Sequence, residues 1–231
     1  MKINYKNYSH FSFDLWLTLI RSNPEFKNKR NLLFKDFFEI DSSIERVSEV
    51  VRYYDVLCNN INEKTGLNLS TYEIYYLILN ALEVDLSLND VNRLGEFYQE
   101  TETLFFNYKP ELIFPHIKLQ FEEIVNEGKS INILSNTGFI KGKSLRKIIA
   151  YYELDSSIDF QIYSDEVGFS KPNKEIFDLM LNKITKNRKI HLSDIVHIGD
   201  NPKADIIGAS SIGIHTLLIN SNNNSITSII N

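Results

Sequence analysis

Hydrophobic and polar positions divide the chain into a short apolar segment, a long helical block and a second half in which helices and strands alternate. The apolar segment, residues 10–20, carries Phe11 and Phe13 and is interrupted by one carboxylate, Asp14. An aromatic strand that ends in an acid is typical of the ligand-binding edge of a parallel sheet. Taken alone, Asp14 is better explained as a residue that caps the turn after a strand, which is the commoner role of a lone aspartate at a strand end.

Between about residues 24 and 108, apolar residues recur at steps of three and four, which predicts amphipathic helices and no strand. An all-helical block placed after the first strand indicates an inserted module. Polar residues mark the predicted helix ends. The first long helix is expected to start with a capping box at Ser42 and Glu45 and to end at Thr65–Gly66, the second to start at Ser70 with Glu73, and the third at Ser87 with Asp90.

After about residue 110 the rhythm changes to alternating helices and strands. Strands are predicted at residues 131–134, 160–163, 195–198 and 215–219, and helices at 117–126, 145–152, 176–184 and 204–211. Such alternation indicates an α/β fold, with a parallel sheet wound by right-handed crossovers. The tail, residues 220–231, is rich in Asn and Ser and is expected to fray.

Composition narrows the class of protein. The 231 residues are 43% hydrophobic and 24% charged, as in ordinary globular proteins, and the net charge of -5 argues against a nucleic-acid-binding surface. No apolar run approaches the roughly 18 residues of a membrane span, and the first residues lack a signal-like apolar core, so we expect a cytoplasmic protein without a membrane partner. The single cysteine, Cys58, is expected to be a reduced core residue.

Polar clusters follow several of the predicted apolar segments, namely Asp14, Ser135–Asn136, Lys171, and Asp200 with Asp205. A parallel sheet gathers the carboxyl ends of its strands at one edge, so these clusters can share a site. Two or more carboxylates suit Mg²⁺, which prefers hard oxygen ligands. Ser135 and nearby amides could hold phosphate oxygens, and Lys171 could neutralise both the phosphate and Asp14.

These segments resemble the four motifs of the haloacid dehalogenase (HAD)-like hydrolase superfamily. Any one of them is a weak signal, but the four occur in the expected order and spacing. They are residues 14–18 (Asp-Leu-Trp-Leu-Thr), 134–137 (Leu-Ser-Asn-Thr), 168–177 (beginning Gly-Phe-Ser-Lys-Pro) and 197–209 (beginning His-Ile-Gly-Asp).

The resemblance implies a Rossmann-like α/β core with a helical cap inserted after the first motif. We therefore expect residues 1–20 and 110–231 to form the core and residues 21–109 to form the cap. The cap resembles that of the family only in its placement and helicity.

The resemblance also implies roles for single residues. Asp14 would attack phosphorus and form an aspartyl-phosphate, and Lys171 would balance the charge of Asp14 and the phosphate. Ser135 would bind the transferred group, with Asn136 close by. The substrate would be a small phosphorylated molecule.

The same resemblance implies a Mg²⁺ site. Asp14, Asp200 and the backbone carbonyl of Trp16 would ligate the ion, and Asp205 would support it from the next layer of contacts. This metal-holding pair of acids argues for Mg²⁺-dependent phosphatase chemistry, because acids facing an anionic nucleophile require a cation between them.

One departure from the family pattern keeps other functions open. Phosphatases of the family usually carry a second aspartate two residues after the nucleophile, where it protonates the leaving oxygen, and here that position is Trp16. Dehalogenases of the family also lack that acid, because halide leaves without a proton. Carbon–halogen hydrolysis is therefore one alternative, and a non-catalytic binding protein is another. The oligomeric state is not indicated.

Overall fold

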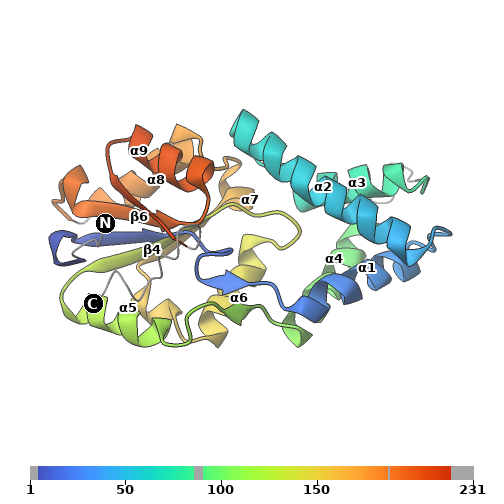
Figure 1. Cartoon of the computed structure of the whole chain (residues 1–231), viewed down its shortest axis with the longest axis horizontal. Coiled ribbons are helices and arrows are strands. Elements are labelled where there is room, and N and C mark those ends of the chain that lie inside the picture. The colour runs from blue at the N-terminus through green and yellow to red at the C-terminus, as the bar shows by residue number, and fades with distance from the viewer. Residues whose placement is uncertain (1–4, 86–90, 187, 220–231) are drawn as a thin grey trace.

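The computed structural model of the chain describes residues 5–85, 91–186 and 188–219. Figure 1 shows a part built around a sheet on one side and a helical part on the other, with helix α2 (Ile44–Thr65) reaching from the helical part toward the sheet. Within the described ranges, no helix combines the length and the apolar character that crossing a bilayer demands.

The sheet has five parallel strands in the order β5-β4-β1-β6-β7, which confirms the predicted α/β class. Its central strand is β1, where Phe13 pairs with Ile133 of one neighbour and Ile198 of the other. The carboxyl ends of the three central strands are therefore level. The strands are β1 (His10–Phe13), β4 (Ser130–Ser135), β5 (Phe160–Tyr163), β6 (Ile195–Gly199) and β7 (His215–Leu218).

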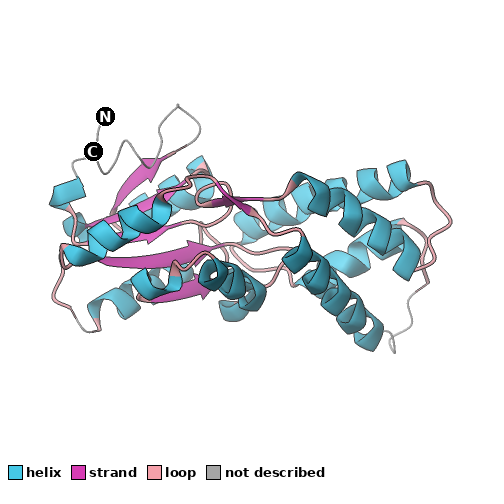
Figure 2. Ribbon diagram, turned by 90° about the horizontal axis from the view of Figure 1, so that it is seen from below, coloured by secondary structure: helices cyan, strands magenta, loops and turns pink. Residues whose placement is uncertain are grey.

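Helices cover both faces of the sheet (Figures 1 and 2). Successive strand side chains point to opposite faces, so Ile133 packs with the hydrophobic cluster of α5 and α6, while Leu134 packs with that of α8. Burial of both faces explains the nearly continuous apolar strands in the sequence. The helices of this part are α5 (Ile117–Asn126), α6 (Gly142–Tyr151), α7 (Ser164–Val167), α8 (Lys174–Thr185) and α9 (Gly208–Ser211), with a π-helical turn at Pro202–Ile207 and short 3-10 turns at Tyr5–Asn7, Asp155–Ser157 and Leu192–Asp194.

The helical part has a hydrophobic cluster of its own. Phe34, Val51, Tyr75 and Phe97 are each fully buried there, and Phe139 joins them from the loop after β4. A separate cluster gives this part its own source of stability. Its helices are α1 (Pro24–Phe37), α2 (Ile44–Thr65), α3 (Thr71–Ala81) and α4 (Val91–Asn107).

The predicted capping box at the start of α2 is wrong by one residue. The N-cap is Ser43, whose hydroxyl accepts a hydrogen bond from the Arg46 N–H at 3.3 Å. The Ser42 carbonyl instead accepts a hydrogen bond from Lys35 Nζ at 2.6 Å, so Ser42 belongs to the connection that closes against α1. Glu45 therefore cannot stand three residues after the cap.

Two other predicted helix ends are confirmed. Ser70 and Glu73 form the reciprocal capping box at the start of α3, and Gly66 ends α2 in the left-handed conformation. The predicted start of the third helix at Ser87 and Asp90 lies outside the described residues, and so does the tail, residues 220–231.

A two-stranded antiparallel ribbon, which the sequence did not predict, lies where the chain passes between the two parts. Its strands are β2 (Ile20–Arg21) and β3 (Glu111–Leu112), with Ile20 opposite Leu112. Because β2 precedes α1 and β3 follows α4, both connections run through this ribbon.

Candidate active site

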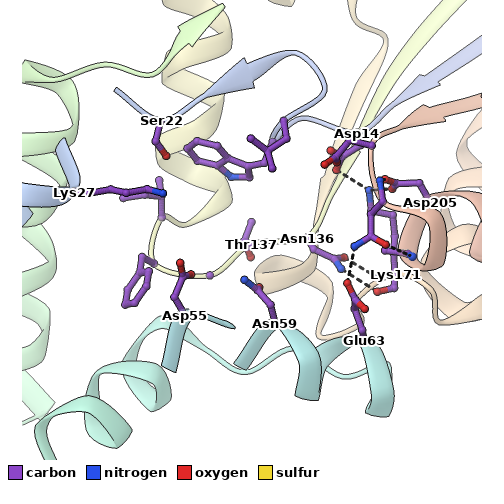
Figure 3. A pocket seen from close by; sticks show the side chains of 18 of the residues that line it. Asp14, Ser22, Lys27, Asp55, Asn59, Glu63, Asn136, Thr137, Lys171 and Asp205 are labelled. Atoms are coloured by element: carbon purple, nitrogen blue, oxygen red, sulfur yellow. Dashed lines mark hydrogen bonds and ion pairs between the residues drawn. The ribbon is translucent and has the colours of Figure 1, made fainter. Parts of the chain in front are cut away.

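The level ends of the central strands place the predicted acids together. Asp14 directly follows β1 and Asp200 directly follows β6, while Asp205 lies on the π-helical turn just beyond. Lys171 reaches the same edge from the loop between α7 and α8. Figure 3 shows Asp14, Lys171 and Asp205 pointing toward one another at one side of a cavity.

Lys171 is the positive centre of this cluster. Its side chain is buried, and Nζ donates hydrogen bonds to Asp14 Oδ1 at 2.7 Å and to Asp205 Oδ1 at 2.6 Å. The Asn136 amide fixes the Lys171 backbone, because its Oδ1 accepts from the Lys171 N–H at 2.7 Å and its Nδ2 donates to the Lys171 carbonyl at 2.9 Å. Asn136 therefore positions the lysine that balances Asp14.

A histidine without a predicted role completes the surroundings of Asp205. Burial lowers the pKa of His197, so its ring is neutral, with Nε2 donating to Asp205 Oδ1 at 3.1 Å and Nδ1 accepting from the Ser12 hydroxyl at 2.9 Å. Burial opposes ionisation of Asp205, but Lys171 and His197 outweigh it and hold its pKa well below the usual range. Asp205 is thus a fixed negative charge.

Gly199 has no side chain, which allows the Asp205 carboxyl group to lie against the backbone at the end of β6. A Cβ atom at Gly199 would lie 2.2 Å from the Asp205 carboxyl carbon, so any other residue there would displace the acid. The Asn201 N–H also donates to Asp205 Oδ2 at 2.9 Å. In the Gly199-Asp200 pair of the fourth motif, Gly199 thus makes room for Asp205, and Asp200 adds a carboxylate to the cluster.

The site carries more negative than positive charge. Oxygen atoms of Asp14, Asp200 and Asp205 lie within 4.8 Å of one another, and the ammonium of Lys171 contacts two of these acids. Burial, opposed by Lys171 and reinforced by Asp205, raises the pKa of Asp14 to about 7, and burial with the charge of Asp205 raises that of Asp200 to about 6. Three hard oxygen donors with surplus negative charge fit a Mg²⁺ ion.

The remaining predicted site residues occupy different positions. Trp16 lines the cavity together with Asp14, and its ring packs against Phe105 with 6.4 Å between ring centroids. Ser135 is fully buried at the end of β4, where its hydroxyl donates to the Asn136 carbonyl at 3.2 Å. Asn136 lines the cavity but Ser135 does not. The predicted contact of Ser135 with phosphate and that of the Trp16 carbonyl with metal stay predictions.

The cavity has a volume of about 360 Å³ and lies between the acidic cluster and helices α1 and α2. Part of its wall is apolar, formed by Trp16, Phe26 and Phe139. The opposite wall is a polar stripe on α2 at spacings of three and four residues, which places its members on one helix face. This stripe consists of Arg52, Asp55, Asn59 and Glu63.

The turn that follows α2 contacts the loop that carries Lys171. The Ser170 N–H donates to the Gly66 carbonyl at 3.0 Å, and Asn173 Nδ2 donates to the same carbonyl at 3.0 Å. The Asn68 N–H in turn donates to the Gly168 carbonyl at 3.1 Å. The position of the helical part and that of Lys171 are therefore linked through two backbone hydrogen bonds and one from the Asn173 side chain.

Sequence reasoning did not identify His197, Asn201 or Glu63 as site residues. His197 and Asn201 flank Asp200 within the fourth motif, so their place in the sequence was the available signal. Glu63 belongs to the polar face of a predicted helix, and nothing in the helical periodicity distinguishes a face that lines a cavity from one in water.

Comparison with known proteins agrees with this geometry. Residues 168–229 match a family model described as HAD-hydrolase-like. The chain is 28% identical over 204 residues to glyceraldehyde 3-phosphate phosphatase of Methanothermobacter thermautotrophicus, covering 80% of this chain and 84% of that protein. It is also 28% identical over 171 residues to ribulose-1,5-bisphosphate 5-phosphatase of Halopiger xanaduensis, covering 72% of this chain and 66% of that protein.

The fold has a solved counterpart in the HAD hydrolase YfnB of Bacillus subtilis, whose structure was determined with magnesium bound. The two share 18% sequence identity with a TM-score of 0.69, covering 95% of this chain and 92% of that one. Motif order, fold and sequence relatives agree, and in all three the chain is similar to hydrolases of the haloacid dehalogenase-like superfamily.

Proposed function

We propose that the protein is a Mg²⁺-dependent phosphatase that hydrolyses small phosphomonoesters through an aspartyl-phosphate on Asp14. The observation that carries this proposal is the buried cluster in which Lys171 bridges Asp14 and Asp205 beside Asp200. Two relatives are named as phosphatases of small phosphorylated sugars, which supports the same substrate class.

The two oxygens of Asp14 have different surroundings. Oδ1 accepts the hydrogen bond from Lys171, whereas Oδ2 has no hydrogen-bond partner in the described part of the chain. Oδ2 is therefore the oxygen we assign to attack on phosphorus. Lys171 stabilises the negative charge that the phosphoryl group brings into the buried site, and Asn136 keeps this lysine in place through its backbone.

The acidic residues account for the proposed metal. Asp14 and Asp200 would hold Mg²⁺, joined by the Trp16 carbonyl, with Asp205 supporting the arrangement. The bound ion would neutralise phosphate charge and keep Asp14 ionised. Residues 1–20 and 110–231 would then form the catalytic core, and residues 21–109 the cap that closes the cavity over the substrate.

Carbon–halogen hydrolysis is the second candidate, because Trp16 stands where phosphatases of the family usually carry an acid. The acidic cluster argues against it. An ester-forming dehalogenase needs one carboxylate nucleophile, and two further acids within 4.8 Å would repel a carboxylate substrate.

The test measures phosphate release from 4-nitrophenyl phosphate with Mg²⁺ or with a chelator, for the native protein and for Asp14→Asn. We expect chelation to abolish turnover and Asp14→Asn to lower it by about 1,000-fold or more, because the nucleophile is lost. Halide release from a 2-haloacid, measured in parallel, is expected to be absent. Phosphatase activity that survives Asp14→Asn, or halide release that ignores the chelator, would contradict the proposal.

A further inference from the structure

Trp16 stands where phosphatases of the family usually carry the acid that protonates the leaving oxygen, so this position offers no carboxyl group for that task. Outside the cluster of Asp14, Asp200 and Asp205, the carboxylates among the described residues that line the cavity are Asp55 and Glu63, both on α2. We propose that Glu63 donates the proton to the leaving group. This inference rests on the proposed phosphatase function and adds a catalytic residue supplied by the helical part.

Glu63 is the cavity carboxylate of α2 that lies beside the acidic cluster. Asn201 Nδ2 donates a hydrogen bond to Glu63 Oε1 at 2.6 Å, and the backbone N–H of Asn201 donates to Asp205 Oδ2 at 2.9 Å. A single residue therefore connects Glu63 to the acid that pairs with Lys171. Figure 3 shows the Glu63 carboxylate pointing from α2 toward Lys171.

The two oxygens of Glu63 are suited to different tasks. The amide of Asn201 engages Oε1 and orients the carboxyl group. Lys203 Nζ lies 3.9 Å from Oε2, which is within ion-pair range but beyond hydrogen-bond distance. Oε2 is thus the oxygen that can carry a proton and meet the substrate. The Glu63 side chain is 19% exposed, which leaves it open to the cavity.

Asp55 is the poorer candidate. Its Oδ2 lies 3.2 Å from Arg52 Nη1, so a neighbouring guanidinium already engages that oxygen. It also lies eight residues before Glu63, about two turns along α2. In Figure 3 it stands on the side of the cavity away from Lys171.

The proposed proton transfers balance over the two half-reactions. In the first, Asp14 Oδ2 forms a bond to phosphorus, the bond from phosphorus to the leaving oxygen breaks with its electron pair on that oxygen, and Glu63 Oε2 gives it a proton. In the second, a water oxygen attacks the aspartyl-phosphate and loses a proton to the Glu63 carboxylate. The bond between phosphorus and Asp14 breaks, which releases phosphate and restores both carboxyl groups.

Leaving-group dependence tests this role. The experiment compares kcat/KM of native protein and Glu63→Gln on glycerol phosphate, whose alkoxide is a poor leaving group, and on 4-nitrophenyl phosphate. Glutamine keeps the oxygen that accepts from Asn201 and removes only the acid. We expect a loss of about 100-fold or more on glycerol phosphate, and less than about 5-fold on 4-nitrophenyl phosphate, whose leaving group needs little protonation.

Two further variants separate acid catalysis from a structural contact. Trp16→Asp, introduced into Glu63→Gln, is expected to restore glycerol phosphate turnover by about 10-fold or more, because it returns an acid to the position that phosphatases of the family use. Asp55→Asn, the matched change at the other α2 carboxylate, is expected to alter both substrates by the same factor.

An equal loss on both substrates, or no loss on either, would overturn the role of Glu63. If Glu63→Gln unfolds at a lower temperature than native protein, Glu63→Asp takes its place, and this acid-retaining variant must keep the native ratio between the two substrates. Failure of the proposed phosphatase function is distinguishable from failure of the Glu63 role. It would appear as native turnover that is absent or insensitive to chelator, or as turnover that survives Asp14→Asn.

Discussion

Asp14 and Lys171 show how burial and charge oppose each other at single residues. Burial favours neutral forms of both, yet each partner favours the charged form of the other, and the pKa of Lys171 is raised above its usual value despite burial. The order of motifs was sufficient to predict that Asp14, Lys171 and Asp200 meet. It could not predict that Asn136 fixes the Lys171 backbone, because that depends on loop geometry.

Another buried residue, His10, gives a prediction about stability and pH. Burial, assisted by repulsion from Arg188 and opposed by the hydrogen bond to Asn132, lowers the pKa of His10 to about 4 from 6.5. Below pH 6.5 the unfolded chain binds a proton that the folded protein does not bind until about pH 4. Acidification through this window should therefore lower the free energy of unfolding by about 3 kcal/mol.

The measurement is urea unfolding of native protein and His10→Gln from pH 8 to pH 4. The difference in the free energy of unfolding between the two proteins isolates the contribution of His10. Asp14 and Asp200, whose pKa values are raised, contribute with the opposite sign, but they do so in both proteins and cancel in the difference. We expect the difference to change steadily below pH 6.5. A difference that stays constant over this range would contradict the assignment of a buried neutral His10.

At the scale of elements, α2 connects the helical part to the chemistry. Its apolar periodicity correctly predicted a helix ending at Gly66, with Val51 and Cys58 on the buried face. The polar face gave no indication that Glu63 meets Asn201, because only the placement of α2 against the core decides which polar residues line the cavity. The one-residue error at Ser42 likewise reflects a tertiary contact, that with Lys35.

Gly66 provides a test of the contact between α2 and the Lys171 loop. Its φ of +72° is in the left-handed region, and an added Cβ would lie 2.8 Å from Asn173 Cβ. Gly66→Ala therefore combines backbone strain with displacement of the loop. We expect a loss of about 2–4 kcal/mol in the free energy of unfolding and a fall of about 10-fold or more in kcat/KM.

Gly128→Ala is the matched control. Gly128 has a φ of +77° but nothing within 4 Å of an added Cβ, so this change imposes the backbone strain alone. It should cost about 1–2 kcal/mol by urea unfolding and leave kcat/KM unchanged. Equal effects of the two substitutions on kcat/KM would show that the turn at Gly66 does not position Lys171.

At the scale of the whole molecule, the strong periodic signals gave the architecture. Strands such as β4 and helices such as α5 lie where the sequence predicted them, because burial of β4 on both faces and of α5 on one face leaves a clear apolar pattern. The β2–β3 ribbon was missed since strands of two residues carry no periodicity. How the two parts meet around the cavity was equally beyond the sequence, because it depends on long-range contacts such as that between Glu63 and Asn201.

The central claim is that Asp14 becomes covalently phosphorylated during turnover. The most direct measurement is rapid acid quenching of the native protein during turnover of a phosphomonoester with ³²P in its phosphoryl group and Mg²⁺ present, followed by peptide mapping. The account predicts that the label resides on the peptide that contains Asp14 and that Asp14→Asn carries none. Steady turnover with no label, or with the label on another residue, would contradict it.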